Sequence, residues 1–174
     1  MRHPVVCRLR LYCEPRRRRK RLYYACFVFA DREAMYLFHE AQDRKRGVNP
    51  GPRDFRGITK RWRWLRRHHR TGRWRLRNNI GCILLTAQTG AGTVSHEMTH
   101  AAIGWATHRG FRLGQISPEV RRTSGNPRAA SRIEERICRV QGDLVRQFWN
   151  GYYHAIGLDQ TMDRVGKTIA NRTA

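Results

Sequence analysis

The stretch IGCILLTAQTGAGTVSHEMTHAAIGW, residues 80–105, decides the fold of this 174-residue chain. Its first part, Ile80 to Ala87, is an apolar run of strand length. Gly90-Ala91-Gly92 breaks that strand, and Thr93 is a suitable N-cap for a following helix. An apolar stripe at helical spacing then predicts one buried helix face, formed by Val94, Met98, Ala101 and Trp105. We therefore expect a strand, a glycine-rich turn and a helix in succession.

Residues 96–100 of this helix read His-Glu-Met-Thr-His, which is the pattern H-E-x-x-H. Positions i and i+4 lie on one face of a helix, so the imidazoles of His96 and His100 can reach one Zn²⁺ ion. Glu97 is rotated by about 100° around the axis. Its carboxylate is then free of the metal but can take a proton from a zinc-bound water. The pattern predicts a zinc-dependent metallopeptidase with Glu97 as the general base.

A catalytic zinc needs a third protein ligand as well as an open position for water. Residues 131–150 predict a second helix, because apolar residues recur there at helical spacing: Ile133, Ile137, Val140, Leu144 and Phe148. Glu135 shares an adjoining face with the small residues Cys138 and Gly142. We expect this face to press against the motif helix and to bring Glu135 to the metal.

Two alternatives for the third ligand stay open. Glu134 is adjacent to Glu135 in the sequence. His108 lies eight residues after His100, whereas a metzincin carries its third histidine six residues after the second, so that pattern is missed. His108 could instead stabilise the C-terminus of the helix, where a cation is favoured.

The residues before the motif predict the rest of a small sheet. Alternation from Val5 to Tyr12 indicates a half-buried strand, and the aromatic and β-branched residues 22–29 indicate a second strand that could pair with it as a hairpin. Asp31 is a plausible N-cap of a helix that Gly47 ends. The fold expected is α+β, with a small twisted sheet, the H-E-x-x-H helix and a second ligand-bearing helix.

All 174 residues are expected to form a single domain in three parts. Residues 1–77 are the strongly basic N-terminal part, residues 78–150 the catalytic core, and residues 151–174 the C-terminal segment. The formal net charge of the chain is +23, and residues 1–77 alone carry 24 Lys and Arg against 6 Asp and Glu, a net of +18. Such a field attracts polyanions, nucleic acid first.

Two stretches concentrate this positive charge. One is the run Arg16–Arg21, and the other is residues 53–77, where Trp62, Trp64 and Trp74 alternate with arginines. This alternation suits either stacking on exposed bases or an edge strand with its arginines outward. An alternative function is therefore a DNA- or RNA-binding protein whose metal site is structural or degenerate.

The five cysteines are odd in number and form no C-x-x-C pair, so neither a disulfide framework nor a four-cysteine zinc site is expected. No apolar run approaches the roughly 20 residues of a membrane span. We expect a protein of the cytoplasm with a peptide or protein substrate, Zn²⁺ as cofactor and no membrane partner.

Residues 80–150 resemble small metallopeptidases encoded by phages and prophages, and within the zincins they resemble the gluzincin group. In gluzincins the ligand glutamate is followed seven residues later by glycine and then by Thr-Leu-Val. Here Glu135 is followed by Gly142 and Leu144-Val145, while the acidic residue that gluzincins carry four positions after the ligand is Arg139. The resemblance implies a zincin-like fold, and a phage origin would place the protein in the host cytoplasm.

The gluzincin resemblance also implies two features of the substrate cleft. One is a strand that lines the cleft and pairs with an extended substrate, for which Ile83–Ala87 is the candidate. The other is an oxyanion donor, for which His154, Tyr152 or Tyr153 is the candidate. A looser likeness, His100-Ala101 followed by His108 and Phe111, is to SprT-like proteases, which act on DNA-bound proteins.

Overall fold

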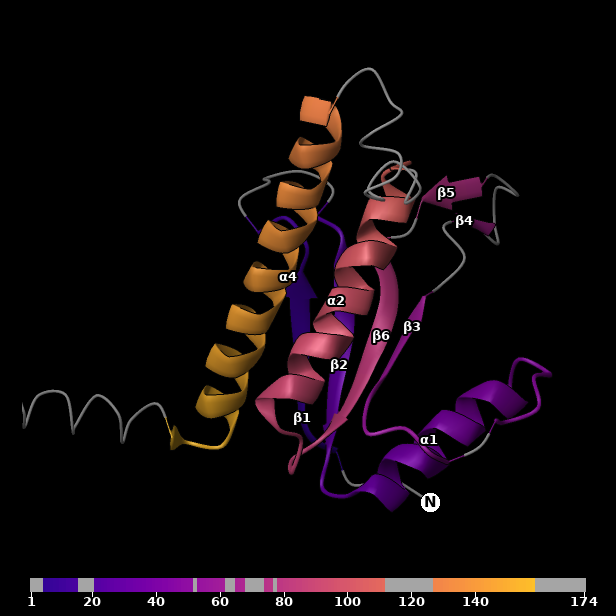
Figure 1. Cartoon of the computed structure of the whole chain (residues 1–174). Coiled ribbons are helices and arrows are strands. Elements are labelled where there is room, and N and C mark those ends of the chain that lie inside the picture. Colours follow the sequence, from indigo (N-terminus) through magenta and orange to yellow (C-terminus); the bar gives the residue numbers. More distant parts are fainter. Residues whose placement is uncertain are drawn as a thin grey trace, which may run out of the picture.

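The computed structural model describes residues 5–15, 21–51, 53–61, 65–67, 74–76, 78–111 and 127–158. In these ranges the chain is α+β, with a small mixed four-stranded sheet, a separate two-stranded sheet and three helices (Figure 1). The α+β prediction is therefore confirmed at this level.

The four-stranded sheet has the order β1-β2-β6-β3. Its strands are β1 (Val5–Tyr12), β2 (Tyr23–Phe29), β3 (Ile58–Arg61) and β6 (Asn79–Thr86). β1 and β2 pair antiparallel, which confirms the predicted hairpin, while β6 runs parallel to β2 and antiparallel to β3. The basic N-terminal part and the motif-bearing part of the chain thus share one sheet.

The position of β6 corrects the prediction about the strand that lines the cleft. Residues of Ile83–Ala87 lie in β6, and β6 is hydrogen-bonded to β2 on one side and to β3 on the other. Over Gly81–Leu84, where β6 pairs with both neighbours, the strand has no backbone groups left for a substrate. Its continuous apolar sequence reflects burial on both faces. The edge next to β6 is formed by β3 instead.

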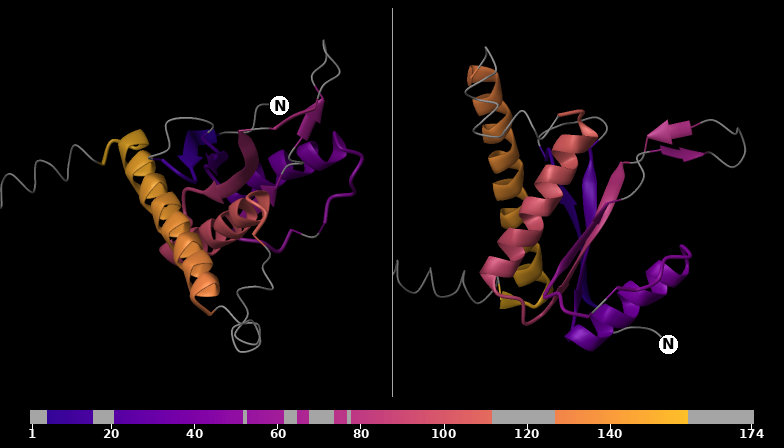
Figure 2. Two further views of the ribbon diagram at one scale, coloured as in Figure 1. Left: turned by 90° about the horizontal axis from the view of Figure 1, so that it is seen from above. Right: turned by 45° about the vertical axis from the view of Figure 1, so that its right-hand side comes forward.

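Helices cover both faces of the sheet. α2 (Ala91–His108) and α4 (Pro127–Ala155) pack on one face, and α1 (Arg32–Arg44) packs on the other, as the rotated views in Figure 2 show. The larger core lies between the sheet and the helix pair, and it includes Trp105, Leu144 and Phe148, each at most 2% exposed. The packing of these side chains fixes the position of α2 relative to the sheet.

The ends of α1 and α2 show how well local signals predict a helix terminus. Asp31 caps α1, since its Oδ1 accepts a hydrogen bond of 2.8 Å from the backbone N–H of Ala34, and Gly47 follows the helix with a φ of 69°. Both predictions are confirmed. The prediction of Thr93 as N-cap of α2 is wrong, because Gly90 takes that position without a side-chain hydrogen bond.

α2 and α4 run antiparallel and contact each other through a polar bridge and an apolar stripe. The side-chain amide of Gln141 donates to the hydroxyl oxygens of Ser95 and Thr99, at 3.0 and 3.1 Å. Further along the pair, the guanidinium of Arg136 lies 5.7 Å from the ring centroid of Trp105. The predicted apolar stripe of α4 is confirmed by the burial of Val140, Leu144 and Phe148.

The face of α4 that carries Glu135 points the other way, contrary to the prediction. Glu135, Cys138 and Gly142 are all exposed, and a Cβ built at Gly142 would meet nothing within 4 Å. Large apolar side chains remove more surface from water than small ones do. The apolar stripe therefore takes the contact with α2, and the small residues stay in solvent.

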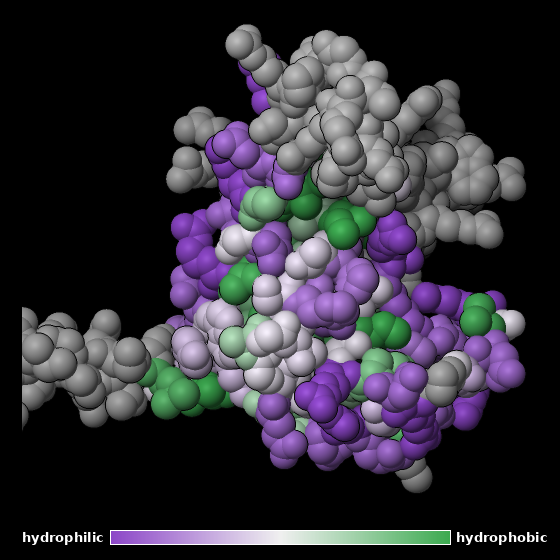
Figure 3. Space-filling model, in the orientation of Figure 1, coloured by the Kyte–Doolittle hydropathy of each residue, from purple (hydrophilic) through white to green (hydrophobic). Residues whose placement is uncertain are grey.

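The tryptophan- and arginine-rich stretch forms a second, two-stranded sheet from β4 (Leu65–Arg67) and β5 (Trp74–Leu76), which projects beyond the end of β3 (Figure 1). Trp62, Trp64 and the run 16–20 lie outside the described residues. None of the helices in the described ranges combines the length and apolar character that crossing a bilayer requires. The face in Figure 3 is mostly hydrophilic, with small separate apolar patches.

Candidate active site

The two motif histidines converge at the surface of α2. Their Nε2 atoms are 3.1 Å apart, and their rings are nearly perpendicular, with centroids 4.6 Å apart. Both side chains are exposed, so solvent and ligands can reach them. The i, i+4 spacing therefore brings the two Nε2 atoms together on one face of the helix, as predicted for His96 and His100.

The donor pair fits a zinc ion. Zinc holds imidazole nitrogens at about 2.0–2.1 Å in tetrahedral geometry, which separates two such nitrogens by roughly 3.3 Å. The observed separation of 3.1 Å is close to that value. Neutral imidazole is also the chemical type of ligand that zinc prefers. His96 and His100 are thus suited to hold one divalent cation between them.

Glu97 lies beside the pair but is turned toward β3. It is only 5% exposed, and the hydroxyl of Thr59 donates to it, at 2.7 Å from Oε2 and 3.0 Å from the backbone oxygen of the same residue. Within the described part of the chain, Oε1 accepts no hydrogen bond. The carboxylate is therefore oriented by one oxygen and keeps the other available for a water or a proton.

Gly57 makes this arrangement of the carboxylate possible. A Cβ at position 57 would lie 2.9 Å from Cγ of Glu97 and 3.3 Å from its Oε1. It would also lie 3.0 Å from Cδ2 of Leu85, so the carboxylate could not keep its place. The absence of a side chain at this buried position leaves room for the carboxylate beside the strand.

One cavity of about 290 Å³ is shared by the two histidines, the carboxylate of Glu97 and the edge strand β3. It lies between α2 and β3 and is lined by Gly57, Ile58, Thr59, Arg61, His96, Glu97, His100 and Ile103. Among the described strands β3 is hydrogen-bonded to β6 alone, so its other edge, beside this cavity, pairs with no described strand. The cavity thus brings together two imidazoles, a carboxylate and a strand edge that pairs with no other described strand.

No third metal ligand joins the pair in the described ranges, where no group of three His, Cys, Asp or Glu is placed to hold a metal. His108 is the last residue of α2, eight residues after His100, so it lies about 12 Å further along the axis. That distance is too long for one ion to span. The helix continues straight through the segment where a turn back toward the metal would be needed.

The two glutamates of α4 are also displaced along the helix pair. Gln141 is the α4 residue opposite the start of the motif, and Glu135 lies six residues before it, roughly 9 Å along the axis and on the exposed face. Glu134 is seven residues before Gln141, which puts it on the face of Gln141 but about 10 Å away. Both glutamates therefore lie closer to the C-terminal end of α2 than Gln141 does.

The three candidate oxyanion donors lie elsewhere. The hydroxyl of Tyr152 donates to the backbone oxygen of Ala87 at 3.3 Å, and its ring stacks on Phe148. Tyr153 stacks on Trp149, and His154 is exposed at the last turn of α4. None of the three lines the cavity that holds Glu97.

Sequence reasoning missed the residues that β3 and the position just before it contribute to the site: Gly57, Thr59 and Arg61. The strand has only four residues, and they follow a loop rich in proline and glycine, so no periodicity marks it. Thr59 and Gly57 also carry no chemistry of their own that a motif search would notice. Their role arises only from the pairing of β3 with β6.

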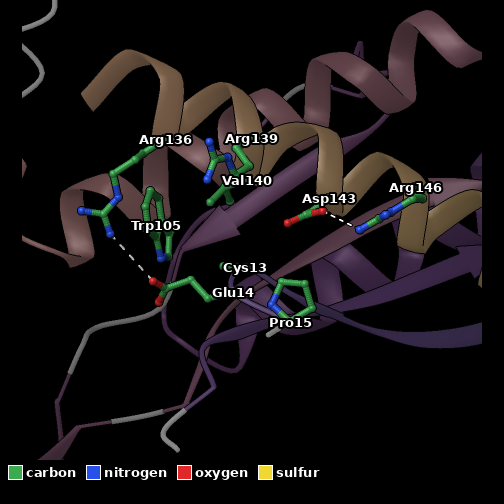
Figure 4. A pocket seen from close by; sticks show the side chains of 9 residues that line it. All are labelled: Cys13, Glu14, Pro15, Trp105, Arg136, Arg139, Val140, Asp143 and Arg146. Atoms are coloured by element: carbon green, nitrogen blue, oxygen red, sulfur yellow. Dashed lines mark hydrogen bonds and ion pairs between the residues drawn. The ribbon is translucent and has the colours of Figure 1, made fainter. Parts of the chain in front are cut away.

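A second cavity, of about 660 Å³, lies between α4 and the end of β1 (Figure 4). It is lined mainly by arginines and carboxylates, among them Glu14, Arg136, Arg139, Asp143 and Arg146. Glu14 pairs with Arg109 and Arg136, and Asp143 pairs with Arg146 at 2.6 Å. Arg139 makes no ion pair with any described residue.

The buried thiol of Cys13 belongs to this second cavity but is not a nucleophile there. Burial raises the pKa of Cys13 far above its usual value, and the nearby charge of Glu14 raises it further. A thiol that stays protonated does not attack. The lining of the second cavity therefore offers three arginines and two carboxylates but no reactive thiolate.

No protein-family model matches this chain, and neither a curated protein nor a solved structure matches it.

Proposed function

We propose that this protein is a zinc-dependent peptidase with a zincin-like active site. The observation that carries the proposal is the placement of His96, His100 and Glu97 around one cavity, with the imidazole Nε2 atoms 3.1 Å apart and the carboxylate held by Thr59. A structural metal site would not need a buried carboxylate with one oxygen left free beside an open cavity.

Each residue of the site has a distinct part in hydrolysis. Zinc, when bound, supplies a Lewis acid that polarises a carbonyl and makes water acidic enough to lose a proton near neutral pH. Glu97 accepts the proton of the attacking water and passes it to the leaving amine. Thr59 keeps the carboxylate in the orientation that this transfer requires. His96 and His100 would hold the metal through their imidazole nitrogens.

The substrate is proposed to lie along β3. This strand is the open edge beside the cavity, and an extended peptide can add to such an edge through backbone hydrogen bonds. Thr59 and the substrate would then face the same cavity from neighbouring strands. The edge strand replaces Ile83–Ala87 in the role that sequence resemblance had suggested.

The third ligand remains a proposal with three candidates, Glu135 and its alternatives Glu134 and His108. All three lie away from the histidine pair in the present structure, so a change in the position of α4 or of the end of α2 would be needed. Zinc content of the three single alanine variants tests this directly. Loss of zinc from one of them, with the fold retained, identifies the ligand.

The experiment that tests the proposed function measures zinc and peptide hydrolysis on the same preparations. We expect wild type to bind one zinc per chain and to cleave an unstructured protein such as casein. His96→Ala should lose the zinc, whereas Glu97→Gln should keep it and lose roughly 100-fold or more in rate, because only the general base is removed. Wild type without stoichiometric metal, or full activity in Glu97→Gln, would contradict the proposal.

A second proposed function is non-specific binding of nucleic acid, which would connect this peptidase with the SprT-like proteases. The observation that favours it is the arginine-lined cavity, in which Arg139 has no partner carboxylate among the described residues. The net charge of +23 adds a long-range attraction for polyanions. We predict that the protein is in the cytoplasm, where nucleic acids would be accessible to it.

A further inference from the structure

Arg61 is the one arginine or lysine among the described residues that line the cavity of Glu97. It is the last residue of β3, its side chain is exposed, and it forms no ion pair or hydrogen bond with any other described side chain. By contrast, Arg53 is paired with Glu33 and Glu40. The charge of Arg61 is therefore available to a ligand.

The stem of Arg61 is held against α2. A Cβ built at Gly104 would lie 2.7 Å from Cδ and 3.2 Å from Cγ of Arg61, and 2.4 Å from the hydroxyl oxygen of Tyr24. The arginine stem and the tyrosine hydroxyl thus occupy the space that the missing side chain of Gly104 leaves. Burial raises the pKa of Tyr24, and the positive charge of Arg61 opposes that rise, so the guanidinium also lies near this hydroxyl.

The position of this stem sets its distance from the reacting centre. Gly104 is four residues after His100, which is one helical turn or about 6 Å along α2. An extended peptide advances about 3.3 Å per residue. A substrate paired with β3 would therefore bring a group one or two residues from the scissile bond within reach of the guanidinium.

We propose that Arg61 is a specificity-determining residue that selects substrates with a carboxylate one or two residues from the scissile bond. The inference rests on the proposed function and adds the class of substrate. A guanidinium binds a carboxylate through two parallel hydrogen bonds, and such a pair is both stronger and more directional than a neutral contact. The carboxylate can belong to an Asp or Glu side chain or to the free C-terminus of the substrate.

The positive field of the protein acts in the same direction. A chain with a net charge of +23 attracts acidic peptides and repels basic ones before any contact forms. That contribution is screened by salt, whereas a close pair with Arg61 is screened less. A preference that persists at high ionic strength therefore separates the local contact from the general field.

The test uses quenched fluorescent peptides that differ only near the cleaved bond. Matched pairs carry Glu or Gln, and Asp or Asn, on either side of that bond, and each peptide is made with a free and with an amidated C-terminus. We expect the zinc-loaded protein to cleave the carboxylate member of at least one pair at least tenfold faster in kcat/KM, at 0.5 M NaCl. The pair that shows the preference identifies the source of the carboxylate.

Two variants test whether Arg61 causes the preference for carboxylate peptides. Arg61→Ala should abolish it, and Arg61→Glu should reverse it in favour of a peptide with Lys at the same position. Arg8→Ala is the matched control, because Arg8 is an exposed arginine on β1, the opposite edge strand, and should leave the preference unchanged. Equal cleavage of both members of every pair by wild type, or a preference that survives in Arg61→Ala, overturns the inference.

A binding measurement separates this inference from the proposed function. Fluorescence anisotropy of the same peptides on Glu97→Gln reports recognition without turnover. If no peptide is cleaved by wild type, the proposed function fails, and tighter binding of carboxylate peptides that is lost with Arg61→Ala still supports an anion-recognising Arg61. Equal binding of all the peptides in that case overturns it.

Discussion

Thr59 and Gly57 fix the orientation of the Glu97 carboxylate, one by a hydrogen bond and the other by leaving space. Thr59→Val keeps the shape of the side chain and removes the donor. A hydrogen bond to a charged group is worth about 1.5–3 kcal/mol, so we expect kcat/KM to fall roughly 10- to 100-fold. Zinc content should not change, because the hydroxyl of Thr59 hydrogen-bonds to Glu97 and not to either histidine.

The matched control at this scale is Thr59→Ser, which retains the hydroxyl. It should keep most of the activity. Steady-state kinetics on the two variants, with zinc content measured on the same samples, provides the check. Equal activity of Thr59→Val and wild type would show that the carboxylate does not depend on this hydroxyl.

At the scale of elements, the edge strand β3 depends on Gly81 in β6. A Cβ at this position would lie 2.2 Å from the backbone oxygen of Lys60 and 2.5 Å from Cε1 of Tyr24. Gly81→Ala should therefore push β3 away and lower the free energy of unfolding by about 1–3 kcal/mol or more. Gly142→Ala is the opposite case, since nothing lies within 4 Å and helix propensity should raise stability by up to about 1 kcal/mol.

Urea denaturation of both glycine variants measures these two changes. Because Thr59 and Arg61 are on β3, Gly81→Ala should also reduce peptide hydrolysis, whereas Gly142→Ala should not. Equal stability of Gly81→Ala and wild type would contradict the close packing of β3 on β6.

Helix α1 is joined to β3 by a buried polar group that predicts a dependence of stability on pH. Asp43 accepts from Lys60 of β3 and lies 3.5 Å from Nδ1 of His39. Burial, and then the charge of Lys60, lowers the pKa of His39, although Asp43 opposes the change. The unfolded chain therefore takes up a proton on His39 more readily than the folded protein does.

Stability should accordingly fall as the pH drops through the unfolded pKa of about 6.5, and the loss should stop below the folded pKa of His39. His39→Asn should remove this part of the pH dependence. Urea denaturation of both proteins between pH 8 and pH 5 checks it. If the free energy of unfolding of His39→Asn falls between pH 8 and pH 5 as much as that of wild type, other groups are responsible.

At the scale of the whole molecule, the arginine-lined cavity predicts a salt-dependent affinity for single-stranded nucleic acid. The logarithm of the binding constant should fall linearly with the logarithm of salt concentration, by about 0.7 for each phosphate contact. Arg139→Ala should reduce that slope by about one contact. Arg132→Ala is the control, because Arg132 is an exposed arginine of the same helix that does not line the cavity.

Fluorescence anisotropy of a labelled oligonucleotide at several salt concentrations measures the slope. Equal effects of Arg139→Ala and Arg132→Ala would indicate a diffuse positive field without a defined site. The cavity in Figure 4 would then have no special part in binding.

The sequence by itself determined the local features of this protein. Helical spacing alone places His96 and His100 on one face and Glu97 beside them, and alternation or apolar runs alone mark β1, β2 and β6. These patterns depend on contacts between residues close in the chain, which the fixed geometry of helix and strand makes predictable. The capping of α1 by Asp31 is of the same kind.

Only the tertiary structure decided which distant residues meet. The order of the sheet made β3 the open edge and put β6 inside, and the packing of α4 turned Glu135 to solvent because the apolar stripe buried more surface against α2. Thr59, Gly57 and Arg61 entered the site for the same reason. Their places depend on pairings across dozens of residues, which no local pattern encodes.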